Sequence, residues 1–196
     1  MQALEREITP MTPINVERQD NSYERHGTQC LIANLDVATG EILSPTIQET
    51  RTEADFEKHI KKTIETDPDA KWIFVVDQLN THKSESLVLL IATLCGLTGI
   101  DLGLKGKNGI LKNMDTRKEF LSNPGHRIRF IYTPKHASWL NQIEIWFSIL
   151  VRRLLTRLSV KSTSELKDKV ADFILYFNQT MAKPFKWTYR GRALQA

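Results

Sequence analysis

Cysteines and long apolar runs are both scarce in this sequence. Its 196 residues include two cysteines, Cys30 and Cys95, which lack the spacing of metal ligands, so we expect small buried apolar residues rather than a disulfide or a zinc site. The longest apolar runs, residues 72–76 and 87–92, fall far short of the about 18 residues that a membrane helix needs. No charged-then-apolar signal pattern opens the chain. We therefore expect a soluble, cytoplasmic protein with no membrane partner.

The composition is that of one globular domain, and its charge is unevenly distributed. Hydrophobic residues make up 41% and charged residues 26%, enough to bury a core, so residues 1–196 are expected to form a single domain. Residues 1–77 carry 15 acidic and 8 basic side chains, whereas residues 78–196 carry 8 acidic and 19 basic ones. The basic half is suited to a polyanion, although a solvated basic face would give the same charge bias.

The apolar pattern predicts an α/β protein. Residues 1–26 are polar, contain Pro10 and Pro13, and are expected to form an irregular lead-in. Residues 97–113, with four glycines and three lysines, are expected to form a flexible basic insertion. The expected elements are a β-hairpin over 28–46 that turns at Gly40, a helix over 52–64, a strand over 71–77, a helix over 84–95, a strand over 127–132, and helices over 138–158 and 164–181. This order predicts a mixed sheet with helices packed on its faces.

Two carboxylates occupy positions that suggest chemistry. Asp77 follows an unalternating apolar run, typical of a strand buried on both faces, and α/β sheets present ligand-binding groups at strand ends. Glu144 falls between Val151 and Leu155 in the apolar stripe of its helix, where an unpaired carboxylate is costly. A turn role for Asp77, and solvent exposure or an arginine partner for Glu144, are the ordinary alternatives. Together in a basic domain, the two suggest a Mg²⁺ site for phosphodiester chemistry, because hard oxygen ligands suit that ion.

Two segments carry a more specific resemblance. Residues 73–84 (IFVVDQLNTHKS) and 130–150 (FIYTPKHASWLNQIEIWFSIL) resemble the second and third catalytic blocks of DDE transposases, in the bacterial insertion-sequence branch of the mariner superfamily. The order Thr-Pro, Ala-Ser-Trp-Leu-Asn and Glu-x-x-Phe in the longer segment is its most specific part. The resemblance extends from about residue 25 to about residue 188. The two carboxylates are farther apart than is usual in that family, and an insertion over residues 97–125 accounts for the excess.

This resemblance implies a fold, a cofactor and partners. It implies a ribonuclease H-like fold in which Asp77 and Glu144 are the second and third members of a carboxylate triad, with Mg²⁺ or Mn²⁺ as cofactor and two ions in a complete site. Double-stranded DNA, as transposon ends and target, is the implied partner, with a homodimer during transposition and a nucleoid-associated location in bacteria. The implied near-site residues are Asn80, His82, Trp139 and Asn141. The residues expected to contact DNA are Lys135, Arg152, Arg153, Arg157, Lys183, Lys186, Arg190 and Arg192.

The family's first catalytic carboxylate has no evident counterpart. It lies on the first, central strand of the sheet, whereas residues 1–26 contain no apolar strand that ends in Asp. Asp36 alternates with Ile32 and Asn34 and could face the sheet, but its nearness to an Ala-Thr-Gly turn favours a turn role. We therefore expect an N-terminally truncated chain without the central strand and without the helix-turn-helix module that grips terminal repeats.

Three functions follow as hypotheses. The first is the catalytic core of a cut-and-paste transposase, which hydrolyses phosphodiesters at transposon ends and joins the freed 3′-hydroxyl to target DNA, and which is inactive in this truncated form. The second is a non-catalytic remnant that binds DNA or a transposase. A nuclease of the same fold that selects particular DNA structures is the third.

Overall fold

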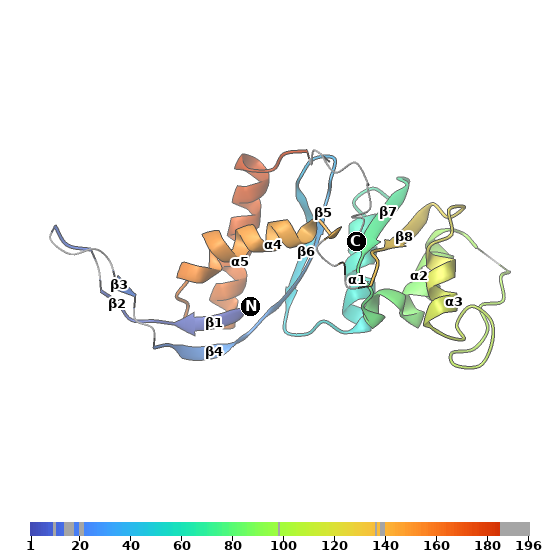
Figure 1. Cartoon of the computed structure of the whole chain (residues 1–196), viewed down its shortest axis with the longest axis horizontal. Helices are drawn as coiled ribbons and strands as arrows, with labels where there is room; N and C mark the ends of the chain where they lie inside the picture. Colours follow the sequence, from blue (N-terminus) through green and yellow to red (C-terminus); the bar gives the residue numbers. More distant parts are fainter. Residues whose placement is uncertain are drawn as a thin grey trace, which may run out of the picture.

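The computed structural model describes residues 1–9, 11–13, 18–19, 22–97, 99–135, 137 and 140–184. Within this part of the chain, five α-helices and several small sheets form a mixed α/β structure (Figure 1), consistent with the expected ribonuclease H-like fold. No described helix is both long enough and apolar enough to cross a membrane. The α/β class that the apolar pattern predicts is therefore confirmed.

The described strands form four two-stranded sheets rather than one continuous sheet. Strands β7 and β8 run parallel, and the other three pairs are antiparallel. The pairs are β1 (Gln2–Glu5) with β4 (Glu24–Thr28), β2 (Ile8–Thr9) with β3 (Arg18–Gln19), β5 (Cys30–Leu35) with β6 (Ile42–Gln48), and β7 (Trp72–Val76) with β8 (Ile128–Tyr132). The β5–β6 pair is the predicted hairpin.

The prediction that residues 1–26 form an irregular lead-in is wrong. Strand β1 pairs with β4, and its Leu4 carbonyl accepts a hydrogen bond from the Val160 backbone N–H at 2.8 Å. The Arg6 N–H also donates to Ser159 Oγ at 2.9 Å. These partners lie up to about 150 residues away, so no local pattern in a short polar segment could indicate the pairing.

Four of the five described helices begin at a side chain that caps their first turn, and two of these, α1 and α2, begin where the sequence predicted. The helices are α1 (Glu53–Ile64), α2 (Glu85–Leu94), α3 (Met114–Leu121), α4 (Ile143–Arg153) and α5 (Thr163–Thr180), with short 3₁₀ turns η1 (Asn80–Lys83) and η3 (Leu155–Arg157). Thr52 and Asp55 form the predicted reciprocal capping box of α1. Gly96 takes φ 64° just after α2, the left-handed conformation expected of a helix stop.

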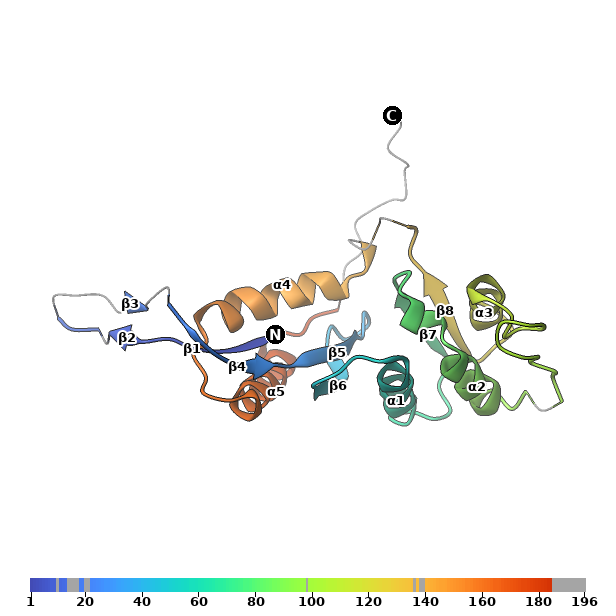
Figure 2. The same cartoon turned by 90° about the horizontal axis from the view of Figure 1, so that it is seen from below.

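Among the described residues, the buried apolar side chains form two separate cores, and the β5–β6 hairpin lies between them in both views (Figures 1 and 2). The first, here called the 56–130 core, comprises Phe56, Ile60, Ile64, Phe74, Val76, Leu87, Val88, Ile91, Ala92, Leu111, Phe120, Leu121, Ile128 and Phe130. The second, here called the α4–α5 core, comprises Ala3, Ile42, Trp146, Leu150, Val160, Leu166, Val170, Ile174 and Phe177.

Strand β7 is not buried on both faces, contrary to the prediction from its unalternating sequence. Phe74 and Val76 are buried toward the 56–130 core, but Ile73 and Val75 are 51% and 50% exposed. On the neighbouring strand, Ile131 is 46% exposed. An uninterrupted apolar run therefore identified the strand correctly but overstated how much of it is covered.

Residues 97–113 are anchored to the fold rather than loose along their whole length. Leu111 is 4% exposed, and Leu102 and Ile110 pack against the 56–130 core. The Leu111 N–H donates to the Leu102 carbonyl at 2.9 Å, and a Cβ at Gly103 would overlap the backbone of Asn108. The three apolar side chains provide the anchorage that a count of glycines and lysines does not reveal.

Candidate active site

The carboxyl ends of the two parallel strands meet at one edge. Val76 and Tyr132 are partners in the β7–β8 register, and the Thr133 N–H donates to the Val76 carbonyl at 2.9 Å. Asp77 and Thr133, the residues that follow the two strands, are thereby held side by side. Helix α4 directs its N-terminal end toward this pair of strands and its C-terminal end away from it (Figures 1 and 2). The fold thus places Asp77 and the start of the Glu144 helix on the same side of the β7–β8 pair.

The Asp77 carboxylate is held in place by groups that follow it in the chain. Its Oδ1 accepts a hydrogen bond from the Leu79 backbone N–H at 3.0 Å. The same oxygen lies 2.9 Å from His82 Nδ1, on η1. These contacts restrict one carboxylate oxygen, and Oδ2 has no hydrogen bond or ion pair within the described part of the chain.

His82 is a mostly buried, neutral partner of Asp77. Its ring packs against Phe56 with 4.3 Å between ring centroids, and its carbonyl accepts a hydrogen bond from Tyr132 Oη at 2.7 Å. Burial lowers the pKa of His82, although Asp77 acts in the opposite direction. A neutral imidazole that donates from Nδ1 to the carboxylate keeps Nε2 as an acceptor. The near-site position expected for His82 is therefore a direct contact with Asp77.

Glu144 is exposed, which corrects its expected position inside the apolar stripe. Helix α4 covers residues 143–153 rather than 138–158, and its buried face is centred on Trp146 and Leu150. Val151, which the helical projection placed inside the stripe, is 47% exposed. The projection centred the stripe wrongly, because it drew on Val151, which is exposed, and on Leu155, which lies beyond the end of α4.

The Glu144 side chain makes no ion pair within the described part of the chain, although its backbone is fixed. Its N–H donates to the Asn141 carbonyl at 3.1 Å, and its carbonyl accepts from Ser148 Oγ at 3.0 Å. The Asn141 side chain is occupied locally, since its Oδ1 accepts from the Ile143 N–H at 3.4 Å. A solvent-facing carboxylate at the start of a helix is free to take a ligand.

The other predicted site residues lie on the surface or outside the described residues. Asn80, the first residue of η1, is exposed. The predicted DNA contacts Lys135, Arg152, Arg153, Arg157 and Lys183 are all exposed. Trp139, Lys186, Arg190 and Arg192 lie outside the described residues. Exposure of the five basic side chains is compatible with DNA contact but does not test it.

Asp36 occupies the hairpin turn. Its Oδ1 accepts from the Ala38 N–H and its Oδ2 from Thr39 Oγ1, both at 2.9 Å. Its backbone carbonyl accepts from the Gly40 N–H at 2.7 Å. Both carboxylate oxygens are thus used to close the turn, as its position beside Ala-Thr-Gly predicts.

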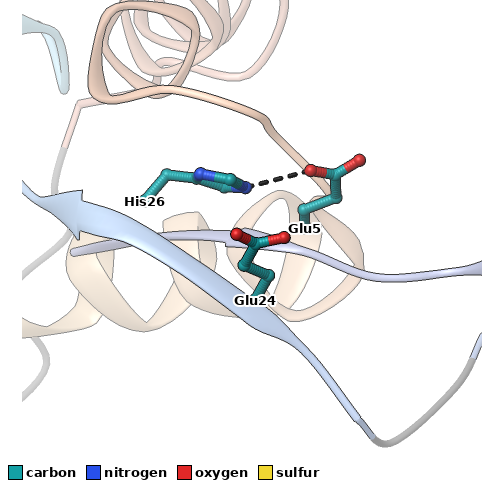
Figure 3. Close-up of side chains that lie close together, drawn as sticks. All are labelled: Glu5, Glu24 and His26. Carbon is teal, nitrogen blue, oxygen red and sulfur yellow. Dashed lines mark hydrogen bonds and ion pairs between the residues drawn. The ribbon is translucent and has the colours of Figure 1, made fainter.

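One group of three potential metal ligands exists among the described residues, and it is remote from Asp77. Glu5 and Glu24 are directly opposite on β1 and β4, and His26 Nε2 lies 2.9 Å from Glu5 Oε2 (Figure 3). Lys161 Nζ lies 3.5 Å from Glu5 Oε1. Basic partners beside Glu5 offset the repulsion between the paired carboxylates, so this cluster is explained without an ion.

Sequence reasoning missed a set of polar groups at the carboxyl edge of β7 and β8. Lys83 Nζ donates to Gln78 Oε1 at 3.0 Å, and Gln78 Nε2 donates to the Thr133 carbonyl. Arg117, on α3, donates from Nη1 to the Lys83 carbonyl at 3.0 Å. Lys83 could have been noticed because it lies in the same motif block as Asp77. Arg117 could not, because it is 34 positions farther along the chain.

Comparison with known proteins supports the chemistry that this edge suggests. The model of one family, described as DDE superfamily endonuclease, matches residues 11–167, which include both Asp77 and Glu144. Endonucleases of this superfamily generally use divalent metal ions and act on DNA. No curated protein matches the sequence. Because the family model covers most of the chain, this protein belongs to the DDE superfamily endonucleases.

Proposed function

We propose that this chain is the catalytic core of a cut-and-paste DNA transposase of the bacterial insertion-sequence branch of the mariner superfamily. The single observation that carries the proposal is the held carboxylate of Asp77, at the carboxyl edge of β7–β8, toward which α4, the helix that contains Glu144, directs its N-terminal end. The family match across both residues adds to it. The substrate is double-stranded DNA, both as transposon ends and as target, and two copies of the chain act together on it.

Asp77 and Glu144 would hold Mg²⁺ or Mn²⁺, because their oxygens are the hard ligands that these ions prefer. Both carboxylates are available to bind a metal ion. Glu144 is exposed and has no ion pair among the described residues, and the two described contacts of the Asp77 carboxylate are both on one oxygen. When bound, such an ion supplies charge stabilisation for the phosphate and activates a water. A complete site holds two ions.

The protein's own groups orient the reacting parts. His82 positions Asp77, because the imidazole fixes the rotation of the carboxylate and is itself fixed by Phe56 and Tyr132. The basic surface residues Lys135, Arg152, Arg153, Arg157 and Lys183 hold the DNA backbone through charge rather than through base recognition. DNA binding is therefore salt-sensitive and has little sequence preference.

We propose a low cleavage activity for this chain by itself. No group of three potential metal ligands among the described residues includes Asp77 or Glu144. Two carboxylates alone would hold at most one ion securely. The same observation favours the second candidate function, a remnant that binds DNA or a transposase without cutting. Measurements of metal binding and of DNA cleavage distinguish the two candidate functions.

The test measures Mn²⁺ binding by calorimetry and nicking of supercoiled plasmid in Mg²⁺ or Mn²⁺. Asp77→Asn and Glu144→Gln should each weaken Mn²⁺ binding at least about tenfold, since removing either carboxylate halves the ligand set. Glu119→Gln, an exposed change on α3, is the matched control and should leave binding unchanged. Mn²⁺ binding that neither Asp77→Asn nor Glu144→Gln weakens would refute the shared metal site. DNA binding without any metal-dependent nicking would favour the remnant.

A further inference from the structure

Lys83 and Arg117 are buried among the described residues, and Lys83 is hydrogen-bonded to Gln78, the residue that follows Asp77. Lys83 is 8% exposed and Arg117 is 7% exposed. Arg117 donates to the backbone carbonyls of Asn113 and Lys83. Neither side chain has a carboxylate oxygen within ion-pairing distance in the described part of the chain. Buried cations usually have an acidic partner, so this arrangement requires an explanation.

Two other lysines, Lys118 and Lys135, add positive charge near Lys83. The ammonium groups of Lys83 and Lys118 lie 5.6 and 5.4 Å from the centroid of the Tyr132 ring. Burial lowers the pKa of Lys83, and the charges of Lys118 and Lys135 lower it further, while Asp115 and Asp77 raise it. A ring face attracts cations, but three lysines near one another still repel.

An unpaired hydroxyl lies at the same edge. Thr133 is 6% exposed, and its Oγ1 has no hydrogen-bond partner among the described residues. The Thr133 carbonyl is linked through Gln78 to Lys83 Nζ. A buried hydroxyl without a partner costs free energy. Near the carboxyl ends of β7 and β8, cationic donors and a spare hydroxyl donor therefore lie beside a carboxylate of the candidate site.

We propose that Lys83 and Lys118, with Tyr132 beside them, bind a backbone phosphate of the DNA strand that lies against Asp77. A phosphate oxygen accepts hydrogen bonds from ammonium groups and offsets the charge that the fold concentrates here. Gln78 and Arg117 position Lys83, through its Nζ and its carbonyl respectively. This inference rests on the proposed action on DNA. It assigns the position of the DNA strand along the candidate site.

The experiment measures binding of a short DNA duplex by fluorescence anisotropy over a series of KCl concentrations in EDTA, so that no divalent ion contributes. Lys83→Met and Lys118→Gln should each weaken binding about tenfold at moderate salt and reduce the slope of log K against log [KCl] by up to about 0.9, the value for one neutralised phosphate, which the two lysines share. Lys83→Arg should retain most of both. Lys61→Gln, which removes an exposed charge on α1, is the matched control and should leave the slope unchanged.

Thermal melts identify variants that merely fail to fold, and Lys118, which is only half-buried, makes Lys118→Gln informative even if Lys83→Met unfolds. Unchanged slopes for the folded variants would overturn the proposal. Equal losses for Lys61→Gln and Lys118→Gln would also overturn it, because they would indicate general charge attraction only. Reduced slopes together with Mn²⁺ binding that neither Asp77→Asn nor Glu144→Gln weakens would retain this phosphate site while refuting the proposed metal site.

Discussion

The two cores of the molecule differ in how they are assembled. The 56–130 core is drawn from one continuous stretch of about 75 residues, whereas the α4–α5 core brings Ala3 and Ile42 together with residues more than 100 positions away. Strand β5 serves both, since Leu31, Ala33 and Leu35 pack against the α4–α5 core and Ile32 packs against the 56–130 core. Because side chains alternate between the two faces of β5, this strand joins the 56–130 core, which is built from one continuous segment, to the α4–α5 core, which is built from distant segments.

This difference matters for the candidate site because each carboxylate belongs to a different unit. Asp77 follows a strand of the 56–130 core, and Glu144 lies on a helix of the α4–α5 core. Their separation therefore depends on the contacts that join the two units. Asn34 on β5 is one such contact, since its Nδ2 lies 2.9 Å from His59 Nε2 on α1.

The largest expected effect comes from a substitution in the α4–α5 core, which tests whether the two cores open separately. Trp146 is 2% exposed and makes edge contacts with Phe147 and Phe177, so Trp146→Ala should cost about 3–5 kcal/mol of unfolding free energy. Hydrogen exchange should accelerate in α4 and α5 more than in α2 and β7. Leu175→Ala, at a 60% exposed position of α5, is the control and should change stability little. Equal acceleration in both units would contradict their independence.

Acid should weaken the junction between the units. His59 is 1% exposed and contacts Asn34 and Thr46, and burial, assisted by Lys62, lowers its pKa to about 4. The folded state therefore disfavours protonated His59, whereas the unfolded chain binds that proton below about pH 6.5. Stability should be complete above pH 6.5 and should fall by about 3 kcal/mol as the pH drops to about 4.

Urea unfolding at a series of pH values measures this loss. His59→Gln should reduce the loss between pH 6.5 and 4, because it removes the group that must be protonated. An equal pH dependence in the wild type and in this variant would assign the effect to other groups, such as His82 or His126, whose pKa values burial also lowers.

Alanine substitutions at two glycines, one in each unit, distinguish the cost of steric overlap from the cost of backbone strain. Gly40 and Gly96 both have positive φ, but a Cβ at Gly40 would overlap the Lys183 backbone, whereas a Cβ at Gly96 would meet nothing. Gly96→Ala should cost about 1 kcal/mol from conformation alone, and Gly40→Ala about 3 kcal/mol because steric overlap is added. Chemical denaturation measures both. Equal costs would mean that the approach of residue 183 to the hairpin contributes nothing.

The smallest expected effects come from helix caps in the two units. Asn113 Oδ1 accepts from the N–H groups of Asp115 and Thr116, and Ser162 Oγ accepts from the Glu165 N–H. Asn113→Ala and Ser162→Ala should each cost about 1 kcal/mol, with Asn113 the larger because it loses two hydrogen bonds. Thermal unfolding curves measure both. A larger cost at Ser162 would indicate that α5 depends on its cap more than on burial.

Much of the 56–130 unit was predictable because its signals are local. The capping box at Thr52, the apolar run before Asp77 and the glycine after α2 each identify an element within a few residues. The motif blocks around Asp77 and Glu144 likewise indicated a DDE-superfamily transposase or endonuclease, and the match to residues 11–167 confirms this superfamily. The roles of these two carboxylates stay predictions.

By itself, the sequence determined the types of the elements that carry the two motif blocks, the turn at Asp36 and the superfamily, because periodicity, caps and motifs act over short distances. Only the tertiary structure decided that Glu144 is exposed, that residues 2–5 form a strand and that Lys83 is buried beside Arg117. Each of these depends on which distant segment covers a given face. Burial is a property of the assembled fold, so short-range patterns could not specify it.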